Sequence, residues 1–129
     1  ISLSRPRGGI AQVLTTGPGS FHDDLVRRAG GANVCATAPS AFPMVGLEAI
    51  LEQRPEVILE LAAEPLSTVE KAALIADWQA FPEIPAAQTG RIVVIDGSFT
   101  VVPGPRLPEL YRAIRAALET PAPSAEPAR

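Results

Sequence analysis

Arg91-Ile92-Val93-Val94-Ile95-Asp96 is the stretch that decides the fold class. Its four consecutive β-branched residues are typical of a strand that is buried on both faces of a parallel sheet. A helix is expected on either side of it. Before it, Ser67 and Glu70 have the spacing of a capping box. After it, a helix that begins near Pro105 would bury one apolar stripe, made of Leu107, Leu110, Tyr111, Ile114, Ala117 and Leu118.

The first half of the chain repeats this alternation. Gly17-Pro18-Gly19 breaks an apolar run, and Ser20 followed by Asp23 resembles a second capping box, which opens a helix ended by Gly30-Gly31. The other expected elements are a strand at 10–16, a very short strand at 33–36, a loop at 39–43, a short helix over 47–51 that stops before Arg54-Pro55, and a strand that begins at 57.

This order of elements predicts an α/β fold. Strands that alternate with helices form parallel sheets with right-handed crossovers. We therefore expect three α/β/α layers around a mainly parallel, Rossmann-like central sheet of about four to five strands. Ligand sites in such sheets lie beyond the carboxyl ends of strands, which directs attention to the loops that start at Gly17, Thr37 and Gly97.

Size and charge limit the function classes. The chain has 129 residues, 47% of them apolar, and a net charge of −3, which fits one domain with one core and gives no basic surface for nucleic acid or anionic lipid. Its apolar runs are far shorter than the roughly 20 residues that span a bilayer. We expect residues 1–119 to form the domain and the Pro/Ala-rich residues 120–129 to be a disordered tail. The first three residues look like the end of a truncated strand.

Few side chains suggest catalysis. His22 and Cys35 are the only histidine and the only cysteine, and no motif relates them. An enzyme that uses them remains an alternative to a helix-start surface histidine and a small buried thiol. The loop that contains Gly17 and Pro18 precedes a helix N-terminus and would direct backbone N–H groups at a ligand anion, although a plain turn is an open alternative.

Several segments, taken together, resemble the carboxyl-terminal lobe of the cobalamin-, haem- and iron-siderophore-binding proteins. Those proteins are the substrate-binding subunits of ABC importers, and their two lobes are joined by one rigid helix. The resemblance covers nearly everything from Ile1 to Leu118. It rests on Thr16-Gly17-Pro18-Gly19-Ser20-Phe21, Ala29-Gly30-Gly31-Ala32-Asn33-Val34, residues 42–51, Arg54-Pro55-Glu56-Val57-Ile58-Leu59, Trp78, residues 90–96 and Pro103-Gly104-Pro105-Arg106.

The resemblance implies roles for particular residues. Glu48 matches a glutamate that pairs with permease arginines, and Phe42 occupies the place of an aromatic residue that faces the ligand. Phe99, Thr100 and Val101 are implied to be residues of the cleft mouth, with Gly17 and Pro18 beside them. An ordinary solvent-facing glutamate and a core phenylalanine remain the alternatives at positions 48 and 42.

A binding module without covalent chemistry is therefore the expected function. The cargo would be a metal chelate, namely cobalamin, haem or a ferric siderophore, with no resident cofactor or metal and no catalytic residues. The expected partners are the permease subunits and the amino-terminal lobe of the same protein, which this sequence lacks. The resemblance implies a periplasmic protein that is peripheral to the membrane. An interaction domain without a small ligand is a further alternative.

Overall fold

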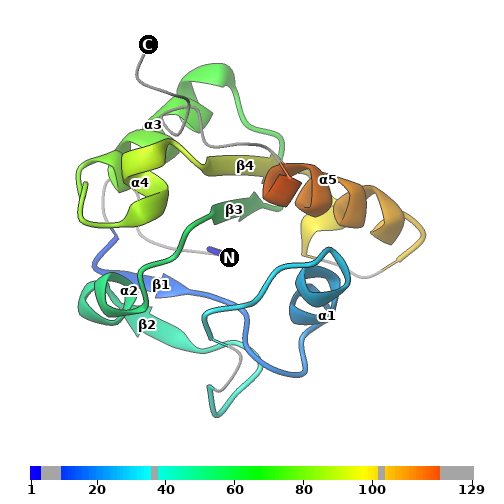
Figure 1. Ribbon diagram of the computed structural model, residues 1–129. Helices are drawn as coiled ribbons and strands as arrows, with labels where there is room; N and C mark the ends of the chain where they lie inside the picture. The colour runs from blue at the N-terminus through cyan, green and yellow to red at the C-terminus, as the bar shows by residue number, and fades with distance from the viewer. Residues whose placement is uncertain (4–9, 36–37, 102–103, 120–129) are drawn as a thin grey trace.

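The computed structural model describes residues 1–3, 10–35, 38–101 and 104–119. In these residues the helices and strands follow one another in this order (Figure 1): β1 (Gln12–Leu14), α1 (Phe21–Arg28), β2 (Met44–Gly46), α2 (Leu47–Gln53), β3 (Ile58–Ala62), α3 (Thr68–Gln79), α4 (Pro85–Thr89), β4 (Ile92–Asp96), the short 3-10 helix η1 (Ser98–Thr100) and α5 (Leu107–Glu119).

The sheet consists of two strand pairs that the first residues of the chain connect. β3 and β4 are parallel, with Ile58 opposite Ile92, whereas β1 and β2 are antiparallel. Ser2 forms a parallel bridge with Glu60 of β3, and the backbone N–H of Leu3 donates to the carbonyl of Leu14 at 2.8 Å. The resulting order is β4, β3, residues 1–3, β1, β2. The predicted α/β fold is confirmed, and its sheet is a mixed one.

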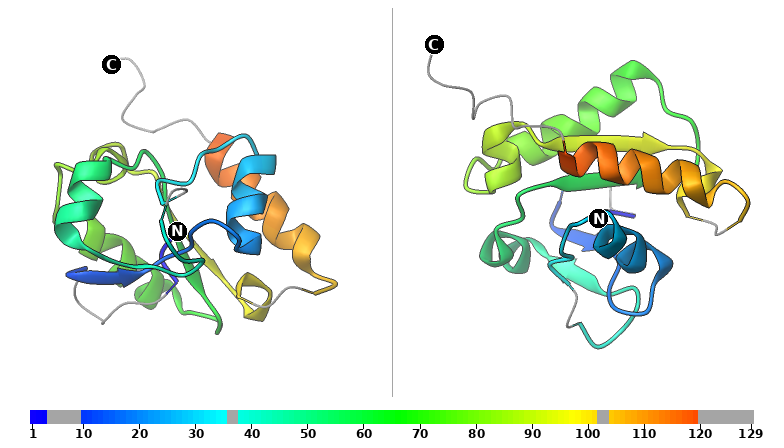
Figure 2. Two further views of the ribbon diagram at one scale, coloured as in Figure 1. Left: turned by 90° about the horizontal axis from the view of Figure 1, so that it is seen from below. Right: turned by 45° about the vertical axis from the view of Figure 1, so that its right-hand side comes forward.

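Helices cover both faces of β3 and β4. Successive strand residues point to opposite faces, so Ile58 joins a cluster with Trp78 of α3, while Leu59 joins another with Ile114 of α5 and Leu25 of α1. Figure 2 shows α3 and α4 on one side of this pair, and α5 and α1 on the other. Trp78 is buried in this core.

The helix caps explain where the helices begin. At α3, Ser67 and Glu70 form a complete capping box. At α1, the Ser20 hydroxyl accepts from the backbone N–H of Asp23 at 3.1 Å, but the Asp23 carboxylate pairs with Arg27 instead of returning to the cap. The predicted start of α1 is thus confirmed, with only the Ser20 half of the capping box present.

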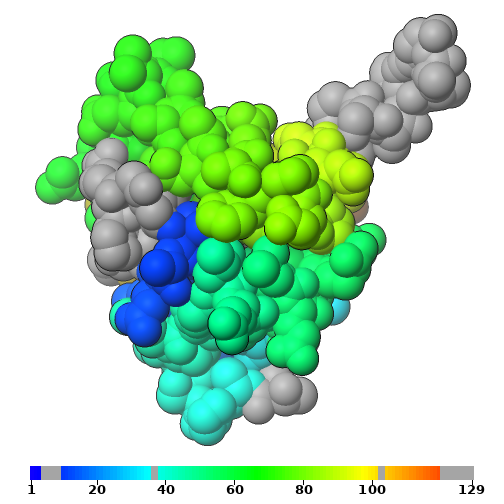
Figure 3. Space-filling model, turned by 90° about the vertical axis from the view of Figure 1, so that its left-hand side faces the viewer, coloured from blue at the N-terminus to red at the C-terminus, as the bar shows by residue number. Residues whose placement is uncertain are grey.

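In Figure 3, α4 lies directly against α2 on the face shown.

Some elements differ from the expectations. β2 and α4 were not predicted, and the predicted strand at 33–36 is wrong for its described residues 33–35. There the Asn33 side-chain oxygen accepts from the backbone N–H of Cys35 at 3.0 Å and closes a turn. The expected tail at 120–129 and the expected loop start at Thr37 lie outside the described residues. Within the part of the chain that the structure describes, no helix is both long and apolar enough to cross a membrane.

Candidate functional site

The Gly17 loop lies against the loop that precedes β2. The backbone N–H of Gly17 donates to the Ala41 carbonyl at 2.7 Å, and that of Thr15 donates to the Pro43 carbonyl at 3.0 Å. A Cβ atom at Gly17 would collide with the Ser40 carbonyl and approach the Pro43 ring to 3.2 Å. This loop-to-loop contact therefore requires a glycine at position 17, and it places Phe42 directly beside the Gly17 loop.

A buried histidine connects the start of α1 to η1. His22 is only 1% exposed, and its Nε2 lies 2.6 Å from the carbonyl oxygen of Thr100. The Thr100 hydroxyl lies 2.7 Å from the Gly97 carbonyl and 3.0 Å from the Ala62 carbonyl, so it donates within the fold. The expectation of a surface histidine is thus wrong, because the ring is buried and bonded to a backbone carbonyl 78 residues further along the chain.

The predicted ligand segments are consequently neighbours. Residues 38–43 lie against the Gly17 loop, that loop leads into α1, and α1 contacts η1. In Figure 1 the Gly17 loop and α1 lie at the lower right, with residues 38–43 below the middle of the molecule and η1 (yellow) above α1. The fold therefore gathers segments from three distant parts of the sequence.

The predicted ligand residues differ in what they expose. Phe42 is 50% exposed, so it is available to another molecule. Phe99 and Val101 are half-buried, and the Arg106 guanidinium lies 4.6 Å from the centre of the Phe99 ring. Pro18 is half-buried as well. Gly17 is buried and Thr100 is fully buried, so neither presents a side chain to solvent.

Glu48 lies in the first turn of α2 and is exposed. A carboxylate in the first turn of a helix is stabilised by the partial positive charge at the helix amino end. Figures 1 and 2 place α2 at the opposite end of the molecule from α1 and η1. Glu48 is therefore separate from the predicted ligand segments.

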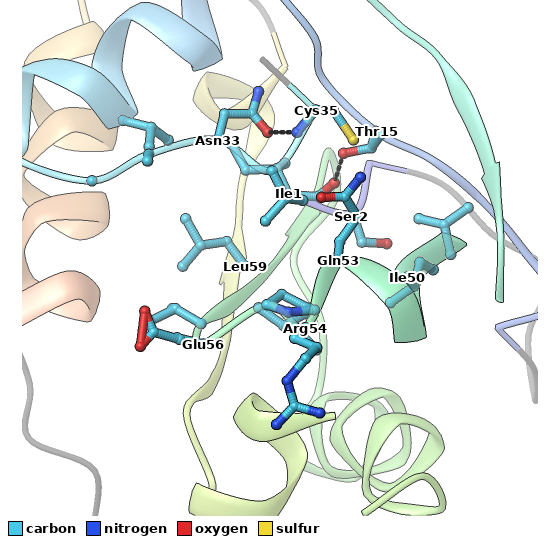
Figure 4. A pocket seen from close by; sticks show the side chains of 18 of the residues that line it. Ile1, Ser2, Thr15, Asn33, Cys35, Ile50, Gln53, Arg54, Glu56 and Leu59 are labelled. Atoms are coloured by element: carbon cyan, nitrogen blue, oxygen red, sulfur yellow. Dashed lines mark hydrogen bonds between the residues drawn. The ribbon is translucent and has the colours of Figure 1, made fainter. Parts of the chain in front are cut away.

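A cavity of about 480 Å³ lies elsewhere and was not predicted (Figure 4). The side chains of Asn33 and Cys35 lie on one side of it and those of Arg54 and Glu56 on the other. No predicted ligand or docking residue is among the residues that line it. Its wall includes the hydroxyl of Ser2, which is buried and has no hydrogen-bond partner among the described residues.

The enzyme alternative needs His22 and Cys35 at one site. Cys35 lines the cavity and His22 does not. Burial raises the pKa of the Cys35 thiol, and a neutral thiol is a poor nucleophile. Burial also lowers the pKa of His22. Within residues 1–3, 10–35, 38–101 and 104–119, no three His, Cys, Asp or Glu side chains gather as metal ligands would.

Asn33 is a positioning residue that sequence reasoning missed. Its amide nitrogen donates to the Thr16 carbonyl at 2.7 Å and to the Asp23 carboxylate at 3.1 Å. Because Thr16 precedes the Gly17 loop and Asp23 belongs to α1, the Asn33 amide links that loop to the helix. An Asn shortly after the Gly30-Gly31 helix end, where side-chain-to-backbone bonding is common, is the signal that could have identified it.

Comparison with solved structures identifies the fold. No protein-family model matches the chain, and no curated protein sequence matches it. An ABC-type Fe3+-hydroxamate transport system protein from Saccharomonospora viridis is 24% identical, with a TM-score of 0.73 over 92% of this chain and 41% of its own. The periplasmic vitamin B12 binding protein BtuF of Vibrio cholerae is 23% identical, with a TM-score of 0.67 over 83% of this chain and 40% of its own.

The periplasmic haem-binding protein BhuT is 27% identical, with a TM-score of 0.64 over 91% of this chain and 44% of its own. The chain thus spans less than half the length of each of these proteins. They bind different cargoes, so the comparison does not select one. The chain has the fold of a single lobe of these periplasmic ligand-binding proteins, as its sequence resemblance indicated.

Proposed function

We propose that this chain is the carboxyl-terminal lobe of the substrate-binding component of an ABC importer. The lobe would supply one half of a cleft that captures a metal chelate, and a second lobe would supply the other half. The observation that carries the proposal is the contact of the Gly17 loop with residues 38–43, together with the contact of His22 with Thr100. These contacts gather the predicted ligand segments on a chain with a binding-protein fold.

The exposed half of Phe42 would provide the main contact with the cargo. An aromatic ring stacks on the flat face of a macrocycle or chelate and loses little side-chain freedom. Phe99 and Val101 would add apolar surface, and Gly17 and Pro18 would add backbone contacts. The buried Thr100 side chain would hold the segment in place. We expect one lobe to bind weakly, because it leaves the other side of the cargo in water.

Glu48 would dock the lobe on the permease. Its carboxylate is exposed and lies away from the predicted ligand segments, so binding of cargo would leave it free. A carboxylate that meets arginines forms charge-assisted, forked hydrogen bonds. This role places the protein outside the cytoplasm, at the membrane surface but not within it.

A chelate panel tests the cargo class. Cyanocobalamin, haem and a ferric hydroxamate siderophore are each added to the chain, and the melting temperature is followed by circular dichroism. A ligand that binds the native state must raise it. We expect one class to stabilise the chain and Phe42→Ala to weaken its binding. Val69→Ala, which truncates another exposed apolar side chain on α3, is the matched control. No stabilisation by any chelate at millimolar concentration contradicts the proposal.

The docking role needs a separate experiment in cells that depend on the importer for cargo. Glu48→Lys should abolish uptake and leave chelate affinity unchanged. Glu83→Lys makes the same charge change at another exposed glutamate and should leave uptake intact. Loss of chelate affinity in Glu48→Lys, or equal uptake by both variants, refutes the docking role.

A further inference from the structure

We propose that His22 is a positioning residue that holds η1 against α1 as a neutral imidazole and releases it when the ring takes up a proton. This inference deepens the proposed function, on which its relevance to cargo rests, because residues 99–101 belong to the predicted cleft mouth. The contact itself is a property of the fold and is tested without a ligand.

The geometry fixes the tautomer of the ring. A carbonyl oxygen only accepts, so His22 Nε2 carries the hydrogen that it donates to Thr100 at 2.6 Å. The other ring nitrogen, Nδ1, is then unprotonated and has no partner among the described residues. The Phe21 ring, whose centre is 3.9 Å from that of the imidazole, lies beside it and offers no acceptor. A proton added at Nδ1 would therefore create a buried cation with an unpaired donor.

No charge on η1 would compensate such a cation. Residues 98–101 are Ser, Phe, Thr and Val, none of which is acidic. Beyond them, the Arg106 guanidinium over the Phe99 ring is paired with the Glu109 carboxylate of α5, so that carboxylate is already held. On α1, the Asp23 carboxylate is already held by Arg27 and Asn33, and Asp24 is held by Arg27 and Arg28. The amino group of Ile1 adds a smaller repulsion.

The direction of the pH effect follows. Burial lowers the pKa of His22 below its ordinary 6.5, although the bond to the Thr100 carbonyl opposes this in part. The contact between His22 and Thr100 is therefore at full strength above pH 6.5. It weakens as the pH falls from there toward the lowered pKa. The reason is that His22 binds a proton more readily when the contact with Thr100 is broken (the opened form) than when the contact is made (the closed form). Within that interval the opened population grows by up to about tenfold per pH unit.

Hydrogen exchange provides the test. Protection factors of residues 98–101, corrected for the intrinsic pH dependence of exchange, are measured from pH 7.5 to pH 5 in the whole chain. They should fall on acidification in the wild type. In His22→Gln, whose amide can donate to the Thr100 carbonyl but does not titrate, they should stay level. Residues of α3, which His22 does not touch, serve as the internal control. An equal fall in wild type and His22→Gln overturns the proposal.

A second measurement needs no variant. The ring nitrogens of His22 are followed by NMR in the wild type over the same pH range. Loss of protection at residues 98–101 should share its midpoint with protonation of the ring. Loss of protection while the ring stays neutral overturns the proposal. Since no chelate is present, failure of the cargo assignment would leave both results interpretable.

Discussion

Gly17→Ala is the substitution that tests the geometry of the candidate site most sharply. The added Cβ would collide with the Ser40 carbonyl and press on the Pro43 ring. Gly17 does not have a positive φ, so alanine brings no backbone strain and the effect comes from space alone. The loops at 17–20 and 38–43 must separate, and the 2.7 Å hydrogen bond from Gly17 to Ala41 is lost.

The cost follows from these two effects. Overpacking of a tight contact costs about 1–3 kcal/mol, and the lost hydrogen bond costs about 0.5–1.5 kcal/mol. We expect the free energy of unfolding to fall by about 2–4 kcal/mol. For a domain of this size, each kcal/mol lowers the melting temperature by about 3–5 °C, so the expected loss is about 6–20 °C.

Thermal and urea unfolding, both followed by circular dichroism, measure this loss. Gly104→Ala is the matched control, because a Cβ at Gly104 meets nothing within 4 Å. It should melt within about 2 °C of the wild type, given that such surface changes cost within ~0.5 kcal/mol. A Gly17→Ala protein as stable as Gly104→Ala would mean that the two loops do not meet, and the candidate site would lose its basis.

Three further predictions concern other parts of the fold. Ser67→Ala removes the cap of α3 and should lower the free energy of unfolding by about 1 kcal/mol in urea, with an unchanged value contradicting the capping box. Arg54, the C-cap residue that follows α2, has φ +51°, so Arg54→Gly should raise the free energy of unfolding by about 0.5–1 kcal/mol, and a loss would refute the left-handed cap. The Leu66 N–H bond holds the pKa of Asp96 below its ordinary 3.8. The stabilisation that this hydrogen bond gives the fold should therefore be complete above pH 3.8 and be lost as the pH falls below it. An NMR titration midpoint of the Asp96 carboxyl above 3.8 would exclude the bond.

The long elements could be predicted because their signals are local. The Ser67 and Ser20 caps act within one helical turn, and the β-branched run at 92–95 has a strand preference of its own. β2 has only three residues, and its strand conformation comes from pairing with β1. Three residues are too few to show a periodic pattern, so the sequence could not predict β2, which forms by pairing with β1. α4, five residues long, had signals that were overlooked, namely Pro85 at its start and a left-handed Gly90 after its end.

The candidate site was predictable in its residues and not in its contacts. The family resemblance singled out Phe42, and the structure leaves half of it exposed. The burial of His22 depends on a backbone carbonyl that no sequence pattern indicates, because any residue could supply it. Thr100 was assigned to the mouth by its position, whereas its hydroxyl is used inside the fold. The cavity beside Cys35 arises from packing among segments that carry no shared motif.

Paramagnetic broadening by a ferric chelate tests the central claim most directly. Amide signals of the chain are recorded by NMR with a ferric hydroxamate or haem, and again with the diamagnetic gallium analogue of each. The account predicts that iron selectively broadens the amide signals of Gly17, Phe42 and residues 99–101. Broadening centred on Asn33 and Cys35 at the cavity would contradict it. So would the absence of selective broadening with either iron chelate, if cyanocobalamin also left the signals of Gly17, Phe42 and residues 99–101 unshifted.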